Sequence, residues 1–157
     1  MHRPGFGRAL LAGLVATVVF TLLLEVAPAM GLPPMNVPAL LGGMFGLNSL
    51  ALGWMMHLVI SVGLVVVYAY GFARRLAGPA WLRGLQFGVL PWLVMMVMIA
   101  PLLGVLDPML AKTPPGFFML HMGAMAPLAS LMAHLIYGAV GGAVYGYTGV
   151  ARRMATA

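Results

Sequence analysis

Two histidines, His57 and His134, occupy matching positions in two segments of similar sequence. The first segment reads MMHLVISVGLVVVYAYGFARR from Met55, and the second reads MAHLIYGAVGGAVYGYTGVARR from Met132. Imidazole nitrogens are ligands for haem iron and for copper, zinc and iron ions. Two imidazoles brought together by a duplicated scaffold would form a haem b or metal site, so these residues are the first candidates for cofactor binding.

Glu25 and His121 are two further candidate metal ligands, and neither is duplicated in the repeat. Glu25 falls near the end of the first apolar segment, whereas His121 precedes the last one. A charged side chain within an apolar membrane segment costs roughly 2.5–3.5 kcal/mol on insertion scales, so it usually faces a protein interior or a cavity. We expect Glu25 at the same level as His57 and His134, with His121 folded over them.

Each of these signals has a structural alternative. A histidine near a membrane surface can hydrogen-bond a neighbouring helix or handle a proton, and duplication copies a structural histidine as readily as a ligand. Glu25 can also extend outward to the interface. Thioethers suit Cu(I), but methionine is also a flexible apolar residue that fills gaps between helices. Both interpretations apply to the methionines that recur around His121, which are Met119, Met122 and Met125.

Motifs typical of enzymes are missing from the sequence. The chain has no Gly-rich phosphate loop, no G-x-S-x-G elbow and no H-E-x-x-H pair. Only two carboxylates are present, so a paired-carboxylate mechanism is difficult to build. Cysteine is absent, which excludes thiolate metal sites and cysteine nucleophiles. We therefore predict a protein without enzymatic activity.

The composition predicts a membrane protein. The chain of 157 residues is 63% hydrophobic and only 6% charged, whereas ordinary soluble domains contain about 25% charged residues. Its length fits a single domain, residues 1–157. A membrane span needs about 20 mostly apolar residues, and four stretches meet this requirement, namely residues 9–29, 50–73, 85–103 and 127–150.

The basic residues predict the orientation of these spans. Seven of the eight basic residues precede the first span, lie between the second and third, or follow the fourth. The positive-inside rule assigns that side to the cytoplasm, which predicts a bacterial inner-membrane protein with both termini cytoplasmic. The net charge of +6 then needs no nucleic acid to explain it. The expected partners are the lipid bilayer and a homo-oligomer or a larger membrane complex.

The repeat determines how the spans must position the histidines. Repeat 1, about residues 5–77, and repeat 2, about residues 82–154, are each expected to form a hairpin of two spans. Because both hairpins start on the same side, they predict an all-α polytopic four-helix bundle with a pseudo-two-fold axis along the membrane normal. His57 and His134 would then lie at equal depth near the outer surface.

Helical periodicity predicts which faces point into the bundle. The face of His57 also carries Ser61 and Tyr68, because eleven steps of about 100° return almost to the starting direction. Stripes of small and polar residues normally face protein, so we expect both histidine faces in the interior. The last span has a small-xxx-small ladder that permits close helix approach, formed by Gly138, Gly142 and Gly146.

The connections add two predictions and one alternative. Both outer connections are rich in proline, and short helices are expected at residues 38–46 and 116–125, with Asn48 capping the second span. A basic start, an apolar run and the A-P-A sequence at residues 27–29 also imitate a signal peptide, whose removal would leave three spans. The match between the first and third spans argues against that alternative.

Four segments of the chain carry a resemblance to a known family. They read GLPPMNVPALLGGM from Gly31, MMHLVISV from Met55, GPAWLRGLQFGVLPWL from Gly78 and HLIYGAVGGAVYG from His134. With these segments the chain resembles an uncharacterised family of small bacterial four-helix membrane proteins, defined by a domain of unknown function. The resemblance covers nearly the whole chain and implies this topology, but it implies no activity.

Three functions are compatible with the sequence. The first is a metal- or haem-binding module near the outer face, with His57 and His134 as ligands and with Glu25 and His121 as additional metal ligands. The second is a non-catalytic accessory or assembly subunit of a larger membrane complex. The third is a small carrier, which would need oligomerisation because four helices leave little room for a passage.

Overall fold

The structure is a computed structural model that describes residues 5–32, 34–106 and 113–154. Within these ranges every regular element is helical, which confirms the all-α prediction. The α-helices are α1 (Phe6–Val26), α2 (Val37–Gly43), α3 (Leu50–Val67), α4 (Ala80–Val94), α5 (Ala100–Leu106) and α6 (Met125–Met154).

Four continuous helical segments are long and apolar enough to cross a membrane. They are Phe6–Met30, Leu50–Phe72, Ala80–Leu106 and Met125–Tyr147. Each overlaps one of the four predicted spans, so the number and order of the apolar helices are confirmed. The third begins five residues before the predicted residue 85, because Pro79 precedes the helix and starts it there.

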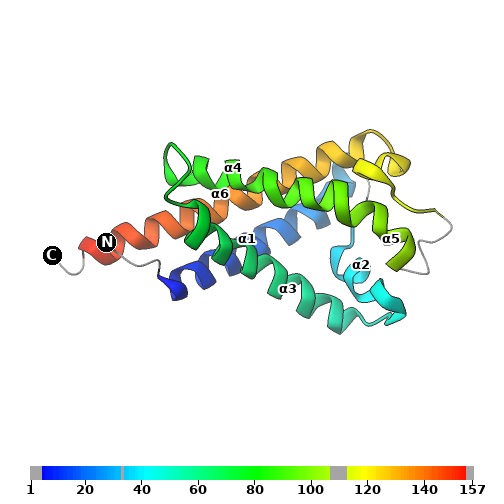
Figure 1. Ribbon diagram of the computed structural model, residues 1–157, viewed down its shortest axis with the longest axis horizontal. Coiled ribbons are helices and arrows are strands. Elements are labelled where there is room, and N and C mark those ends of the chain that lie inside the picture. The colour runs from blue at the N-terminus through cyan, green and yellow to red at the C-terminus, as the bar shows by residue number, and fades with distance from the viewer. Residues whose placement is uncertain (1–4, 33, 107–112, 155–157) are drawn as a thin grey trace.

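The four long helices are packed unequally against one another (Figure 1). Helix α1 lies between α3 and α6, and α4 packs along α6 on the other side. The main body of α3 makes little contact with α4 or α6, and it diverges from them toward the end where α2 lies. Helix α2 packs against α3, so the connection between α1 and α3, rather than a long helix, covers that part of α3.

Small residues make the α1 and α6 contacts close. On α1, Ala9, Ala12 and Ala16 are completely buried, and the backbone of Gly13 is so near α3 that a Cβ there would lie 2.9 Å from the Cα of Val62. Among the four long helices, the closest pair is α4 and α6. A Cβ on Gly142 would lie 2.8 Å from the Cα of Gly84, so the predicted glycine ladder on the last span is confirmed as a site of close helix approach.

Two of the long helices contain a π-helical turn. Residues Met95–Ile99 form such a turn between α4 and α5, and Tyr68–Phe72 form another at the end of α3. Pro101 follows the first of these turns, and in a regular helix its ring would collide with the carbonyl of Val97. The wider π turn accommodates this proline and lets the helical segment continue to Leu106.

The connections from α1 to α3 and from α5 to α6 contain short helical segments, as their prolines and capping residues predict. Asn36 caps α2 by accepting a hydrogen bond from the Ala39 amide at 2.8 Å. Residues Phe117–Met122 form 3₁₀ turns that are interrupted by a kink, because Phe118 and Met119 have left-handed φ values of 53° and 54°. The predicted Asn48 cap is wrong, because Asn48 adopts a left-handed conformation with φ of 45°. Ser49 is the cap of α3 instead, and its hydroxyl accepts from the Leu52 amide at 3.3 Å.

Candidate functional site

His57 lies on the buried face of α3. Its side chain is only 3% exposed, and Ser61 and Tyr68 on the same face are 8% and 3% exposed. The prediction that these three residues share an interior face is confirmed. His57 faces α1, where it meets Thr21 and Phe20. Tyr68, at the other end of the stripe, instead packs against Phe87 of α4 and Tyr145 of α6.

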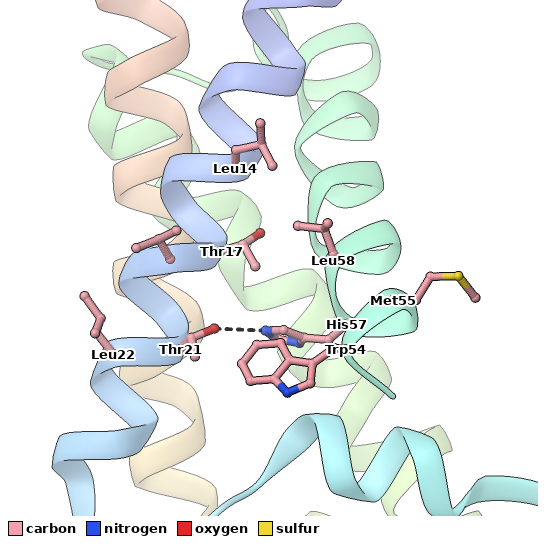
Figure 2. A pocket seen from close by; sticks show the side chains of 9 residues that line it. Leu14, Thr17, Thr21, Leu22, Trp54, Met55, His57 and Leu58 are labelled. Carbon is pink, nitrogen blue, oxygen red and sulfur yellow. Dashed lines mark hydrogen bonds between the residues drawn. The ribbon is translucent and has the colours of Figure 1, made fainter. Parts of the chain in front are cut away.

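The imidazole of His57 has three neighbours. Its Nε2 atom is 3.1 Å from the Thr21 hydroxyl oxygen, a hydrogen bond between α3 and α1 (Figure 2). The indole of Trp54 meets it edge to face with ring centroids 5.9 Å apart, and the phenyl ring of Phe20 lies 6.1 Å away. His57 is therefore held by one polar contact in an aromatic environment.

His134 is fixed separately on α6. Its Nδ1 atom is 2.8 Å from the carbonyl oxygen of Ser130, one helical turn earlier. Because a carbonyl only accepts, Nδ1 is the donor. Phe20 packs against the imidazole in a T-shaped arrangement with centroids 5.3 Å apart. Three residues later, the Tyr137 hydroxyl donates to the backbone carbonyl of Ser61 and so ties α6 to α3.

The two histidines share Phe20 as a neighbour rather than contacting each other. The Phe20 ring is 8% exposed and packs against both imidazoles. Between His57 and His134 there is no hydrogen bond and no ring contact among the described residues. Within the described ranges, no group of three or more His, Asp or Glu side chains is placed to surround a metal ion. The structure therefore brings the pair to one aromatic ring and gives each imidazole a different partner.

Glu25 and His121 are both exposed, and neither contacts His57 or His134 within the described residues. The Glu25 side chain is exposed in the last turn of α1 and makes no hydrogen bond or ion pair with any described residue. His121 is also exposed, and its Nδ1 atom is 2.8 Å from the carbonyl oxygen of Pro114. The His121 imidazole thus lies next to Gly116, within the connection that precedes α6, and does not fold over the other two histidines.

The methionines around His121 do not converge on it. Met119 is 1% exposed and belongs to an apolar cluster with Met96, Trp92 and Phe118. Met122 and Met125 are 41% and 53% exposed. The packing supports the interpretation of methionine as an apolar residue that fills gaps between helices.

A groove between α1 and α3 is the feature that sequence reasoning missed. It has a volume of about 510 Å³, within the range of about 300–1,000 Å³ that is usual for small-molecule sites. Figure 2 shows the side chains around it. The groove is lined by Leu14, Thr17, Val18, Thr21, Leu22, Trp54, Met55, His57 and Leu58.

The groove has apolar walls and one polar point. The Thr17 hydroxyl is occupied because it donates to the Gly13 carbonyl at 2.7 Å, whereas the Thr21–His57 pair lies at the wall. Two threonines four residues apart in an otherwise apolar span were the available sequence signal. Thr17 and Thr21 lie on one side of α1, but the groove on that side is formed only where α3 supplies its other wall.

Comparison with known proteins gives a family but no activity. Residues 5–156 match the model of the Family of unknown function (DUF6789). The chain therefore belongs to this family, which confirms the resemblance to an uncharacterised family over nearly its whole length. Neither the curated proteins nor the solved structures contain a significant match.

Proposed function

We propose that this DUF6789 member is a multi-pass protein of the bacterial inner membrane that binds a small lipid-soluble molecule in the α1–α3 groove and catalyses no reaction. The observation that carries the proposal is the hydrogen-bonded Thr21–His57 pair in the wall of an otherwise apolar groove. Apolar pockets with a few well-placed polar groups are typical of small-molecule sites.

The proposed topology has both termini in the cytoplasm. The described arginines are at one end of the helices, in agreement with the positive-inside rule. Arg8 is in the first turn of α1, Arg74 and Arg75 follow α3, and Arg83 is in the first turn of α4. Since the chain has no native cysteine, single cysteines can test this assignment. Leu47→Cys, at a position 57% exposed, is expected to react with a membrane-impermeant maleimide on spheroplasts, and Ala77→Cys only after lysis. The reverse pattern would refute the topology.

The proposed architecture is a four-helix bundle of two hairpin repeats. Two arginines support it, Arg8 and Arg83, which occupy corresponding positions in the two repeats. Arg8 of the first repeat donates to the Tyr145 carbonyl in the second helix of the other repeat. Arg83 of the second repeat donates to the Ala73 carbonyl, just after the second helix of the first. Both contacts join one repeat to the other, as a pseudo-two-fold axis requires, although the acceptors are not equivalent, since Tyr145 matches Tyr68 in the repeat and not Ala73. The departure from symmetry is α3, which packs on α1 but diverges from α4.

The depth of the polar point restricts the chemistry of the ligand. His57 is seven residues from Leu50 at the start of α3, which corresponds to roughly 10 Å along the helix axis. A charged head group at this depth would cost roughly 2.5–3.5 kcal/mol on insertion scales. The ligand class that fits is an uncharged lipid whose head carries a hydrogen-bonding oxygen, such as a quinone ring with an isoprenoid or alkyl tail.

Quenching of Trp54 fluorescence tests this binding. The chain has three tryptophans, so the variant Trp81→Phe with Trp92→Phe reports on the groove alone. A decyl-substituted benzoquinone is expected to quench Trp54 saturably, whereas decanoate, which carries a charge, binds at least about tenfold more weakly. Quenching that rises without saturation, as it does for a tryptophan ester dissolved in the same detergent, would reject a defined site.

A metal or haem site at His57 and His134 is the second candidate function. The observation that favours it is that both imidazoles pack against Phe20, so displacement of one side chain would open space between them. Glu25 and His121 would have to leave their present positions to join such a site. Protein purified from haem-replete, metal-replete cells should then show a Soret band or stoichiometric copper, zinc or iron, and the absence of all of them would eliminate this candidate.

A further inference from the structure

Arg8 lies where the first turn of α1 meets α6, at the end of the molecule opposite Glu25. Its guanidinium carbon is 4.5 Å from the centre of the Tyr145 ring. Its Nη2 atom donates to the Tyr145 carbonyl oxygen at 3.2 Å. These contacts fix the guanidinium against α6 and determine the direction in which its other donors point.

The hydrogen-bonding capacity of Arg8 is mostly unused within the described chain. A guanidinium has five N–H donors, and one of them reaches Tyr145. The Nε atom of Arg8 is buried and has no hydrogen-bond partner among the described residues. A buried donor without an acceptor costs about 1–3 kcal/mol, and more for a charged group. Because protein atoms cover Nε, an acceptor from outside these residues would approach the guanidinium from its Nη side and stabilise the charge there.

Arg83 occupies the position in the second repeat that corresponds to Arg8, and its side chain has more hydrogen-bond acceptors than that of Arg8. Arg83 donates from Nε to the Gly78 carbonyl at 2.5 Å and from Nη1 to the Ala73 carbonyl at 2.9 Å. The inner connection between α3 and α4 folds beneath Arg83 and supplies both acceptors. Only one carbonyl plays the same role at Arg8 in the part of the chain that the structure describes.

Among the described residues, no carboxylate compensates the charge at this end. Glu25 is the one acidic residue within the described ranges, and it follows Arg8 by seventeen residues of helix, roughly 25 Å. This is far beyond the Debye length of about 8 Å at physiological ionic strength. The exposed Arg74 and Arg75 in the inner connection add further positive charge. The missing acceptor should therefore be an anion.

We propose that Arg8 binds a phosphate oxygen of an anionic phospholipid head group where α1 meets α6. Phosphate suits a guanidinium because it accepts two parallel hydrogen bonds. A lipid supplies the phosphate at this position because α1 begins here with an exposed apolar residue, Phe6, which is 57% exposed. Tyr147, which is 75% exposed, lies two residues beyond Tyr145 and provides an amphipathic ring at the same level.

Calorimetric titration of the detergent-solubilised full chain tests the site. The probes are dioctanoyl phosphatidylglycerol, dioctanoyl phosphatidylcholine and inorganic phosphate. We expect saturable binding of the phosphatidylglycerol, at least about tenfold weaker binding of the zwitterionic lipid, and no binding of phosphate at millimolar concentration. Equal binding of the two lipids by the wild-type protein would overturn the proposal. Phosphate binding as tight as that of the anionic lipid would instead show a site for free anions and overturn the lipid assignment.

Paired arginine variants separate a specific site from general attraction. Arg8→Gln is expected to weaken phosphatidylglycerol binding by about tenfold, whereas Arg75→Gln removes the same charge from an exposed position and should change it less than about twofold. Equal losses in both variants would contradict a site at Arg8. If Arg8→Gln does not fold, Arg8→Lys keeps the charge, and it should still bind several-fold more weakly because it loses the two-pronged geometry. The site is at the other end of α1 from the Thr21–His57 pair, so quinone binding should be unaffected by these variants.

Discussion

Replacement of Gly142 by leucine is expected to cause the largest loss of stability in this protein, about 3 kcal/mol or complete misassembly. Helices α4 and α6 meet at glycines, and a Cβ on Gly142 would lie 2.8 Å from the Cα of Gly84 and also against the Ala80 carbonyl. Backbone atoms cannot rotate away as a side chain can. The helices would have to separate, and the dispersion contacts along the whole interface would be lost.

Gly63→Leu is the matched control for this prediction. Gly63 lies on α3, and a Cβ there would meet no atom within 4 Å. The substitution adds the same side chain and the same helix propensity, but it does so in open space. The free energy of unfolding can be measured by titration with sodium dodecyl sulfate, followed by circular dichroism. We expect a large shift of the midpoint for Gly142→Leu and a small one for Gly63→Leu, and comparable shifts would show that the α4–α6 contact is not critical.

Filling the groove with Val18→Phe is expected to weaken quinone binding by at least about tenfold. Val18 is on α1, lines the groove and is 59% exposed, so the larger ring has room to form without disturbing the helix core. The phenyl group would occupy the space in which the ligand tail lies. Binding should fall while the free energy of unfolding stays nearly unchanged, because no buried packing is altered.

Val59→Phe provides the comparison for the groove. Val59 is 64% exposed on α3 and does not line the groove. The same change of volume and apolar area at that position should leave the affinity for the quinone within about twofold. If both variants bind as the parent does, the quinone lies elsewhere on the protein, and if both lose binding equally, the effect is one of partition into the detergent.

Much of the helical framework follows from the sequence, for reasons that particular residues make clear. The apolar runs require four long helices, and the stripe of His57, Ser61 and Tyr68 is buried as the helical period requires. Glycines at every fourth position of α6 required a close partner, and α4 is that partner. Local chemistry was sufficient for these features because period and residue size determine the buried face of a helix.

The helix that packs against each buried face was not predictable. Helical periodicity shows which side of a helix is buried, but it does not show which other helix lies there. The sequence left open whether the two histidines approach each other, and nothing in it indicated that Phe20 of α1 would pack against both. Helix α3 diverges from α4 and packs against α2 instead. The spacing of apolar residues does not predict this divergence. The groove depends on the same long-range arrangement, since its walls come from two helices whose separation no local pattern specifies.

The N-cap of α3 was also not predictable from the sequence. Asn48 and Ser49 are both good capping residues, and the sequence alone does not separate adjacent candidates. The chain turns at Asn48 through a left-handed conformation that asparagine tolerates. This turn leaves Ser49 in the extended conformation from which its hydroxyl reaches the Leu52 amide.

The most direct measurement of the central claim is the quenching of Trp54 by the decyl benzoquinone in the parent protein and in Val18→Phe and Val59→Phe. A ligand site at the Thr21–His57 pair predicts saturable quenching in the parent and in Val59→Phe, and a curve displaced by at least about tenfold in Val18→Phe. Three superimposable curves, or quenching that never saturates, would contradict a binding site in the α1–α3 groove.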